Sequence, residues 1–485
     1  MFVPHIPHVR DAEFFLGKRS WFCTGVFRAK LPNDFAPNYL MQVLSALGFD
    51  IIFAVMKKYR KRIADSLLLE KLSYMGAVLV RGAKWCGKTT TARQIARTTV
   101  LLADSKRGAA NRQLAQQRPD RLLAGTYPLL IDEWQEEPSL WDAVRSLVDE
   151  IGERGMFILT GSAVPPQVDE EDARRAIRHT GTGRIARLTM RPMTLWESGD
   201  ANGSVSFSDL FKGIDVSGAS SKLELEDISD LICRGGWPGA MGLRGQMARG
   251  PAREYFEAIC ETDISRVDDT LRDPLRVRGV IKSLARLQGT QSSASVICRD
   301  VMANDVASLT EDTVYSYLKA LTKIFVTEDL EAWCPNLRCK TPIRTTATRY
   351  FTDPSIAAAA LGIGSDELLG DLPTFGLFFE TLAIRDLRTY AEQLGGRLYH
   401  YHDKSGLECD AVMRLENGEY GLIEVKTGGD ALIAKGCKSL KALSAKIDAT
   451  KMPQPSFKMV LTADGDFAYR NDDGILVCPI GCLRG

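Results

Sequence analysis

Consecutive residues near position 85 have the types and the spacing of a phosphate-binding loop. They fit the pattern GxxxxGK[ST] and are followed by a second threonine: Gly82, Ala83, Lys84, Trp85, Cys86, Gly87, Lys88, Thr89 and Thr90. In such a loop, backbone N–H groups close around phosphates at a helix N-terminus, the lysine brings a positive charge to the β and γ phosphates, and the hydroxyl can bind Mg²⁺. The pattern predicts an ATP site in which Lys88 contacts phosphate and Thr89 contacts Mg²⁺.

A pair of acids at the end of an apolar run supplies the second part of that chemistry. The run Leu129-Leu130-Ile131-Asp132-Glu133 has the form of a Walker B strand. At such a strand end, Asp132 can hold Mg²⁺ through water, and Glu133 can polarise the water that attacks the γ-phosphate. Two acids can also simply end a strand at the surface, but the nearby phosphate loop favours the catalytic interpretation.

Small hydroxyl residues and two arginines complete the candidate ATP site. The run Met156 to Leu159 ends in Thr160-Gly161-Ser162, and the hydroxyl residues of this end, Ser162 included, are predicted to contact the γ-phosphate or to orient water. Arg184 or Arg191 could stabilise the transition-state charge, in cis or toward a neighbouring subunit, so an oligomer stays open. For either arginine, an ordinary surface ion pair is the alternative.

Short apolar strands alternate with helical sequence around these motifs. Strands are predicted at 77–80, 128–131 and 156–159, each with helical sequence before it. Apolar runs in this order are typical of a parallel sheet that is covered by helices on both faces. The sequence therefore predicts a doubly wound α/β domain.

With these motifs the chain is similar to the AAA-type P-loop ATPases that are fused to a C-terminal domain of uncharacterised function, a family widespread in bacteria and archaea. The resemblance runs from about residue 57 to the end. Its marks are the GxxxxGKTT loop, residues 130–135 with Pro138, residues 159–162, Gly183-Arg184, Arg191 to Leu195, and Gly235 to Pro238. The resemblance implies ATP binding and Mg²⁺-dependent hydrolysis by Lys88, Thr89, Asp132 and Glu133. It leaves the biological target undefined.

The middle of the chain reads as mostly helical. Three short helices are followed by an extended stretch at 324–333, an order that suggests a winged helix-turn-helix. The third helix presents Lys319 and Lys323 outward, which would suit a phosphate backbone, whereas Glu311 and Asp312 at its start would repel one. DNA and a protein are both open as partners of this region.

Four polar residues near the C-terminus resemble the metal site of the PD-(D/E)xK nuclease fold. Glu380 lies on a predicted helix, Asp410 at the start of a strand, and Glu424-Val425-Lys426 at the end of another strand. In that fold the carboxylates bind Mg²⁺ and the lysine helps to activate water. Strand alternation sends Glu424 and Lys426 to one face. The alternative is an inert descendant that keeps the fold as a structural or DNA-binding module.

The composition limits the partners and the compartment. The chain has 485 residues and a formal net charge of +1, so any contact with nucleic acid must be local. Eleven cysteines without a CxxC pair indicate neither a disulfide framework nor a zinc site. The apolar stretch at 40–56 is interrupted by Gln42, Gly48 and Asp50. We therefore expect a cytoplasmic protein without a transmembrane helix.

The expected fold class is α/β, with a mostly α winged-helix region between two α/β domains. The predicted organisation is an N-terminal extension at 1–55, the AAA-type ATPase domain at 56–200, a linker at 201–230, the helical region at 231–345, and the nuclease-like domain at 346–485. The expected function is ATP hydrolysis with Mg²⁺, coupled to a C-terminal region that binds DNA or protein. The alternatives are nucleotide-gated binding without significant turnover and an ATP-licensed, metal-dependent DNA nuclease.

Overall fold

The computed structural model describes residues 59–162, 181–267, 270–305, 308–335, 347–448, 450 and 452–485. The chain divides into two units, Met1–Lys57 and Lys58–Gly485, and all described residues belong to the second unit. The predicted N-terminal extension therefore lies outside the described residues.

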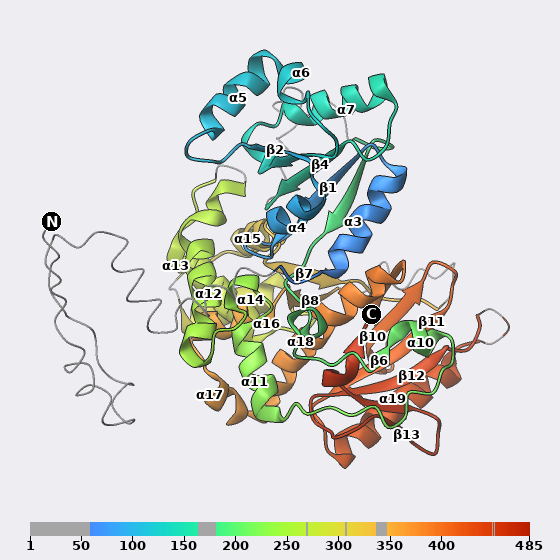
Figure 1. Ribbon diagram of the computed structural model, residues 1–485. Helices are drawn as coiled ribbons and strands as arrows, with labels where there is room; N and C mark the ends of the chain where they lie inside the picture. The colour runs from blue at the N-terminus through green and yellow to red at the C-terminus, as the bar shows by residue number, and fades with distance from the viewer. Residues whose placement is uncertain are drawn as a thin grey trace, which may run out of the picture. The chain divides into compact units, whose positions relative to one another are not determined.

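A five-stranded parallel sheet forms the first part of this unit (Figure 1). Its order is β2-β3-β4-β1-β5. The strands are β1 (Ala77–Arg81), β2 (Thr98–Leu101), β3 (Leu129–Asp132), β4 (Phe157–Gly161) and β5 (Ile185–Thr189). Helices follow β1, β2 and β3 and connect each to the next strand in the chain, as a parallel sheet requires. The predicted parallel sheet with helices is confirmed, and it has the α/β architecture of a P-loop NTPase domain.

Helices cover both faces of this sheet. They are α3 (Ile63–Tyr74), α4 (Lys88–Ile95), α5 (Gly108–Gln117), α6 (Pro119–Leu122) and α7 (Leu140–Ile151). Successive residues of β1 belong to different cores, because Val78 and Val80 pack in the cluster that contains α3 and α4, whereas Leu79 packs with Trp141 and Val144 of α7. Burial on both faces explains why the strands read as uninterrupted apolar runs.

The predicted linker at 201–230 is wrong. This segment contains β6 (Val205–Ser206) and α10 (Phe207–Phe211), and β6 pairs in parallel with β15 (Leu483–Arg484) at the end of the chain. Val205 and Phe207 are fully buried. The Gly, Ser and Asp content of the segment conceals these few apolar anchors, because composition averages over a window and does not show which side chains pack.

A helical region follows, and its helices extend beyond the predicted bounds of 231–345 on both sides. Its helices are α11 (Leu225–Arg234), α12 (Gly245–Ala258), the π-helix η5 (Ile259–Asp263), α13 (Pro274–Arg286), α14 (Ala294–Asn304), α15 (Glu311–Lys323), α16 (Pro354–Leu361) and α17 (Ser365–Leu369). After α15, β7 (Thr327–Leu330) pairs antiparallel with β8 (Thr348–Phe351). Because β8 pairs with β7, it belongs to this region and not to the C-terminal domain, where the predicted boundary would place it. The winged-helix assignment stays a prediction.

The C-terminal domain is a six-stranded mixed sheet of order β13-β14-β12-β11-β10-β9. Its elements are α18 (Leu372–Gln393), β9 (Gly396–His402), β10 (Glu408–Leu415), β11 (Tyr420–Lys426), α19 (Asp430–Lys446), β12 (Phe457–Thr462), β13 (Tyr469–Arg470) and β14 (Leu476–Pro479). One face packs against α18 and the other against α19. None of the helices in the described residues has the length and apolarity needed to cross a membrane.

Candidate functional site

The phosphate loop joins β1 to α4 and takes its shape from two glycines. Gly82 has a φ of +152° and Gly87 a φ of +104°, conformations that residues with a Cβ rarely adopt. A Cβ at Gly82 would lie 2.0 Å from the carbonyl oxygen of Met190, so only glycine fits there. The loop therefore packs directly against the chain that follows β5.

Lys88 lies inside the loop that its motif predicts. The side chain is buried, and its Nζ donates to the carbonyl oxygens of Gly82 (3.0 Å) and Ala83 (2.8 Å). Cys86 is also buried, and its Sγ donates to the carbonyl oxygen of Met190 at 3.4 Å, whereas Thr90 is exposed. Of the predicted loop residues, Lys88 is thus the one whose charge is held at the loop itself.

Asp132 connects the two Walker motifs. Its Oδ1 accepts hydrogen bonds from the hydroxyl groups of Thr89 and Thr160, each at 2.6 Å. This is possible because β4 lies between β1 and β3, so three carboxyl strand ends meet at one edge of the sheet. Hydroxyl and carboxylate oxygens are ligands that Mg²⁺ prefers, so Thr89 and Asp132 fit that ion.

Glu133 follows Asp132 in an unusual backbone conformation. Its φ of 55° is one of three positive values at non-glycine residues among the described ranges, and a second belongs to Trp85 of the phosphate loop. The Nε2 of Gln135 donates a hydrogen bond to the Glu133 carboxylate. Strained backbone of this kind concentrates at functional sites, where neighbouring contacts hold it in place.

The structure shows which of the predicted hydroxyl residues contacts Asp132, and it adds two residues, Gln135 and Arg62, to which the motifs assign no role. Thr160, and not the buried Ser162 two residues later, contacts Asp132. Gln135 holds Glu133. Arg62 is buried and donates to the carbonyl oxygen of Cys86 at 2.9 Å. Only the proximity created by the fold identifies them.

The role of Arg184 in cis is wrong. The register of β1 and β5 aligns Ala77 with Ile185, so Arg184 lies beside the beginning of β1, whereas the phosphate loop follows its end. Five strand residues separate the two edges by roughly 15–20 Å. The Arg184 side chain is exposed and forms an ion pair with Asp149 at 2.7 Å. A role toward a neighbouring subunit is not tested by this placement.

Arg191 lies at the correct edge of the sheet, but carboxylates of other regions hold its side chain. It forms ion pairs with Glu328 of β7 at 2.6 Å and with Glu392 of α18 at 3.0 Å. Arg191, together with Arg388, lowers the pKa of Glu328 to about 2 against the opposing effect of burial. Arg191 therefore joins the end of β5 to both following regions.

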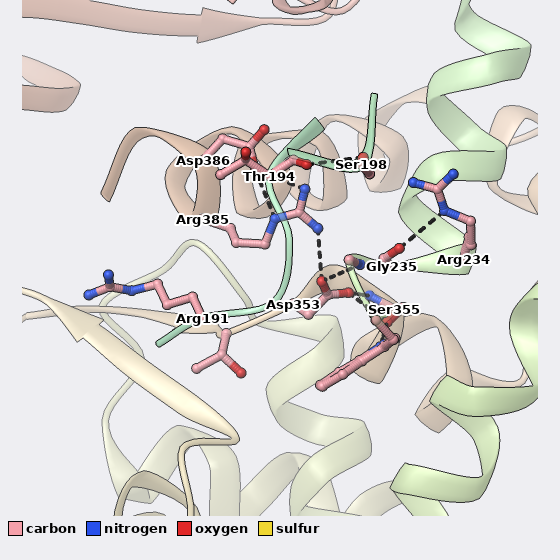
Figure 2. A network of polar contacts seen from close by, with 12 residues as sticks. Arg191, Thr194, Ser198, Arg234, Gly235, Asp353, Ser355, Arg385 and Asp386 are labelled. Carbon is pink, nitrogen blue, oxygen red and sulfur yellow. Dashed lines mark hydrogen bonds and ion pairs between the residues drawn. The ribbon is translucent and has the colours of Figure 1, made fainter. Parts of the chain in front are cut away.

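Two segments that carry no catalytic chemistry, residues 191–195 and 235–238, meet in a buried polar network between these regions (Figure 2). Arg385 of α18 forms ion pairs with Asp353 and Asp386, both at 2.8 Å. Asp353 accepts from the backbone N–H of Gly236, and Asp386 accepts from that of Leu195, both at 2.9 Å. The segments 191–195 and 235–238 thus serve as connectors between parts of the fold.

The four predicted residues of the C-terminal domain come together. Lys426 Nζ lies 2.8 Å from Asp410 Oδ2 and 2.7 Å from Glu424 Oε2. Asp410 Oδ2 also accepts from the backbone N–H of Val425 at 2.7 Å, and Tyr350 donates to Glu380 at 2.5 Å. We call Glu380, Asp410, Glu424 and Lys426 the acid cluster.

The electrostatics of the acid cluster favour proton uptake by two of its carboxyl groups. Burial, with the charge of Asp410 as the next cause, raises the pKa values of Glu380 and Glu424 to about 8. Glu380 and Asp410 also line a polar cavity of about 280 Å³ that reaches His400 and His402. Three acids thus share one lysine.

In this arrangement a lysine lies between two of the carboxylates that are predicted to bind metal. Within the described ranges, no group of three or more His, Cys, Asp or Glu side chains has the geometry to hold a metal ion. The ammonium group of Lys426 bridges Asp410 and Glu424 and so occupies the space between these carboxylates. One oxygen, Glu424 Oε1, is buried without a hydrogen-bond partner. The oxygen donors for a cation are present, and in this arrangement Lys426 is the cation that pairs with two of the carboxylates.

The fold and the first site are those of a P-loop nucleotide-binding domain. A family model described as AAA domain matches residues 75–198. Two further models, both described as domains of unknown function (DUF8612 and DUF4143), match residues 225–367 and 375–483. Uncharacterized proteins of Mycobacterium bovis and Mycobacterium tuberculosis are each 25% identical to the chain over 383 residues, which cover 78% of the chain and 76% of either relative.

Two solved structures are also similar to the chain. The Walker-type ATPase of Pyrococcus abyssi is 16% identical, with a TM-score of 0.38, and the match covers 62% of this chain and 96% of that one. The ORC1 protein of Aeropyrum pernix in complex with DNA is 14% identical, with a TM-score of 0.25 and coverage of 63% and 93%.

Proposed function

We propose that this protein hydrolyses ATP with Mg²⁺ and transmits the nucleotide state to its helical region and C-terminal domain. The observation that carries the first part is Asp132, which accepts hydrogen bonds from Thr89 of Walker A and Thr160 of β4. Thr89 and Asp132 would hold Mg²⁺, and the bound ion would neutralise charge that develops on the phosphate oxygens.

Side chains of this protein bind the phosphates, accept the proton of the attacking water and orient the base. Lys88 and the loop amides bind and orient the phosphates. Glu133 accepts a proton from the attacking water, whose oxygen forms a bond to the γ-phosphorus while the bond to the bridging oxygen breaks, giving ADP and phosphate. The Gln135 amide holds the Glu133 carboxylate, so it orients the base.

Transmission is supported by side chains next to the loop that contact other regions. Arg191, just after β5, pairs with Glu328 of β7 and Glu392 of α18. Arg81, the last residue of β1, lies over the ring of Phe325 with its Cζ 5.9 Å from the ring centroid. A displacement of the loop would therefore shift side-chain contacts in both the helical region and the C-terminal domain.

The test separates binding from turnover. Lys88→Ala should weaken ATP binding, because it removes the positive charge that contacts the phosphates. Glu133→Gln should keep ATP binding but slow turnover by about 100-fold or more, because it removes the general base. Equal turnover of Glu133→Gln and parent would refute the assigned role. Binding without turnover in the parent would favour the nucleotide-gated module. Turnover with and without DNA at two salt concentrations would identify a nucleic-acid partner.

A second candidate is metal-dependent cleavage of nucleic acid by the acid cluster. The unpartnered Glu424 Oε1 favours it, since a buried carboxylate oxygen without a donor is costly unless a cation reaches it. Mn²⁺-dependent cleavage of DNA by the parent that Asp410→Asn and Lys426→Ala both abolish would support this candidate. Cleavage that survives in both variants would come from elsewhere.

A further inference from the structure

Two side chains of the phosphate loop, Lys84 and Trp85, contact residues of the helical region. Lys84 and Trp85 stand at variable positions of GxxxxGK[ST], so phosphate binding does not specify them. Lys84 Nζ forms an ion pair with Asp263 Oδ1 at 2.5 Å. The Asp263 side chain is only 7% exposed, whereas that of Lys84 is 38% exposed. A charged group at the end of η5 is thus buried against the loop.

Aromatic contacts flank this ion pair. The ring of Trp85 lies 5.8 Å from that of Tyr255 in α12, and Tyr255 packs edge-on against Trp237 at 4.9 Å. Tyr255 is fully buried, and the backbone of Lys84 lies close enough to its hydroxyl group to oppose the rise in pKa that burial causes. One residue of the loop therefore meets the helical region through both its backbone and its side chain.

The backbone of Trp85 shows why these contacts matter. Its φ is 63°, in the left-handed region that a bulky side chain rarely adopts. Such a conformation persists only when surrounding contacts determine it. The residues on the far side of those contacts, Asp263 and Tyr255, lie outside the segment that matches the AAA domain.

We propose that Asp263 and Tyr255 are positioning residues for the ATP reaction, because they hold Lys84 and Trp85 so that the loop is shaped before the nucleotide arrives. This inference rests on the proposed ATP site and names its regulator, the helical region. By linkage, nucleotide binding must stabilise the same contacts, so any partner that displaces η5 would weaken nucleotide binding by the same factor. The helical region then acts as an effector of the loop in cis.

The experiment measures nucleotide affinity and kinetics on the full chain. Asp263→Asn should raise the Kd for ATP and the KM by about tenfold, with kcat changed less than twofold, because loop shape is lost and the base is untouched. Asp263→Glu should recover part of the affinity. Tyr255→Phe keeps the ring and removes only the hydroxyl, so it should fold and raise Kd by about threefold.

Charge reversal and a matched control show whether the ion pair positions the phosphate loop or only stabilises the fold. Lys84→Asp and Asp263→Lys should each weaken ATP binding, and the double variant should restore it. Glu257→Gln breaks an ion pair with Arg278 in the same helical region, in which the Glu257 side chain is 45% exposed, so it should leave Kd at the parent value. If Asp263→Asn and Tyr255→Phe both lower thermal stability but keep the parent Kd, the inference is overturned. If the parent itself does not bind ATP, the proposed function fails instead.

Discussion

Replacing Asp353 by asparagine should destabilise the junction of the three regions. Asp353 is fully buried and accepts hydrogen bonds from the backbone N–H groups of Gly236 (2.9 Å) and Ser355 (3.0 Å), and from the Ser355 hydroxyl (2.6 Å). It also pairs with Arg385, whose side chain is 1% exposed. Asp353→Asn keeps the volume but places an N–H₂ group where an acceptor is needed, and it removes one of the two negative charges that face Arg385 (Figure 2).

The magnitude follows from what remains around Arg385. Breaking a buried ion pair costs about 3–5 kcal/mol, since the other charge stays buried. Asp386 remains 2.8 Å from Arg385, so we expect the lower end, about 3 kcal/mol. The matched control is Asp473→Asn, which breaks a pair with Lys441 in which both side chains are more than 40% exposed, and it should cost less than about 1 kcal/mol.

The assay is urea-induced unfolding followed by tryptophan fluorescence. Trp237 is a local reporter, because it is fully buried and its Nε1 donates to the Ser355 hydroxyl at 2.9 Å. Asp353→Asn should move the transition of the parent to lower urea, and Asp473→Asn should not. A midpoint for Asp353→Asn no lower than that of Asp473→Asn would refute the reasoning, because it would mean that the buried pair contributes no more than an exposed one.

Two further predictions concern the two candidate sites. The raised pKa values of Glu380 and Glu424, about 8 against 4.5 in the unfolded chain, mean that the native state binds more protons between these limits, so their contribution to stability is lost as the pH rises through 8. In EDTA, thermal stability should therefore fall less between pH 5 and 9 in Glu380→Gln than in the parent. His400, whose pKa is lowered to about 4, makes stability rise with pH, but it does so equally in both proteins. Parallel plots of thermal stability against pH for the two proteins would contradict the prediction. At the ATP site, Gln135→Ala should lower kcat by about tenfold at unchanged Kd for ATP, because Glu133 loses its orienting hydrogen bond; a changed Kd with unchanged kcat would assign Gln135 to binding.

The sequence predicts those parts of the fold whose signal is local. The phosphate loop is written in eight adjacent residues, and the buried strands are apolar runs that end in acids or hydroxyls. Strand alternation alone places Glu424 and Lys426 on one face, and in the structure Lys426 pairs with both Glu424 and Asp410. In each case, the residues that interact are close in the chain or lie on paired strands.

The remaining features depend on contacts between distant positions. Arg191 and its partners Glu328 and Glu392 are separated by 137 and 201 residues, so nothing near Arg191 indicates where its side chain goes. Arg184 fits a motif of glycines followed by arginine, but its position relative to the loop follows from the register of β5 against β1. Register and long-range pairing are set by packing, which a local pattern does not encode.

Helix α18 is the element on which these distant contacts converge. It carries Glu392, which pairs with Arg191 beside the phosphate loop, then Arg385 and Asp386 of the buried network, and Glu380 of the acid cluster. Glu380 and Glu392 are 12 residues apart on one uninterrupted helix, a rise of about 18 Å. A packed helix moves as a rigid body, so a shift at one end must appear at the other. If ATP controls the acid cluster, α18 is the physical connection that both sites share, and Arg191 is where the nucleotide domain holds it.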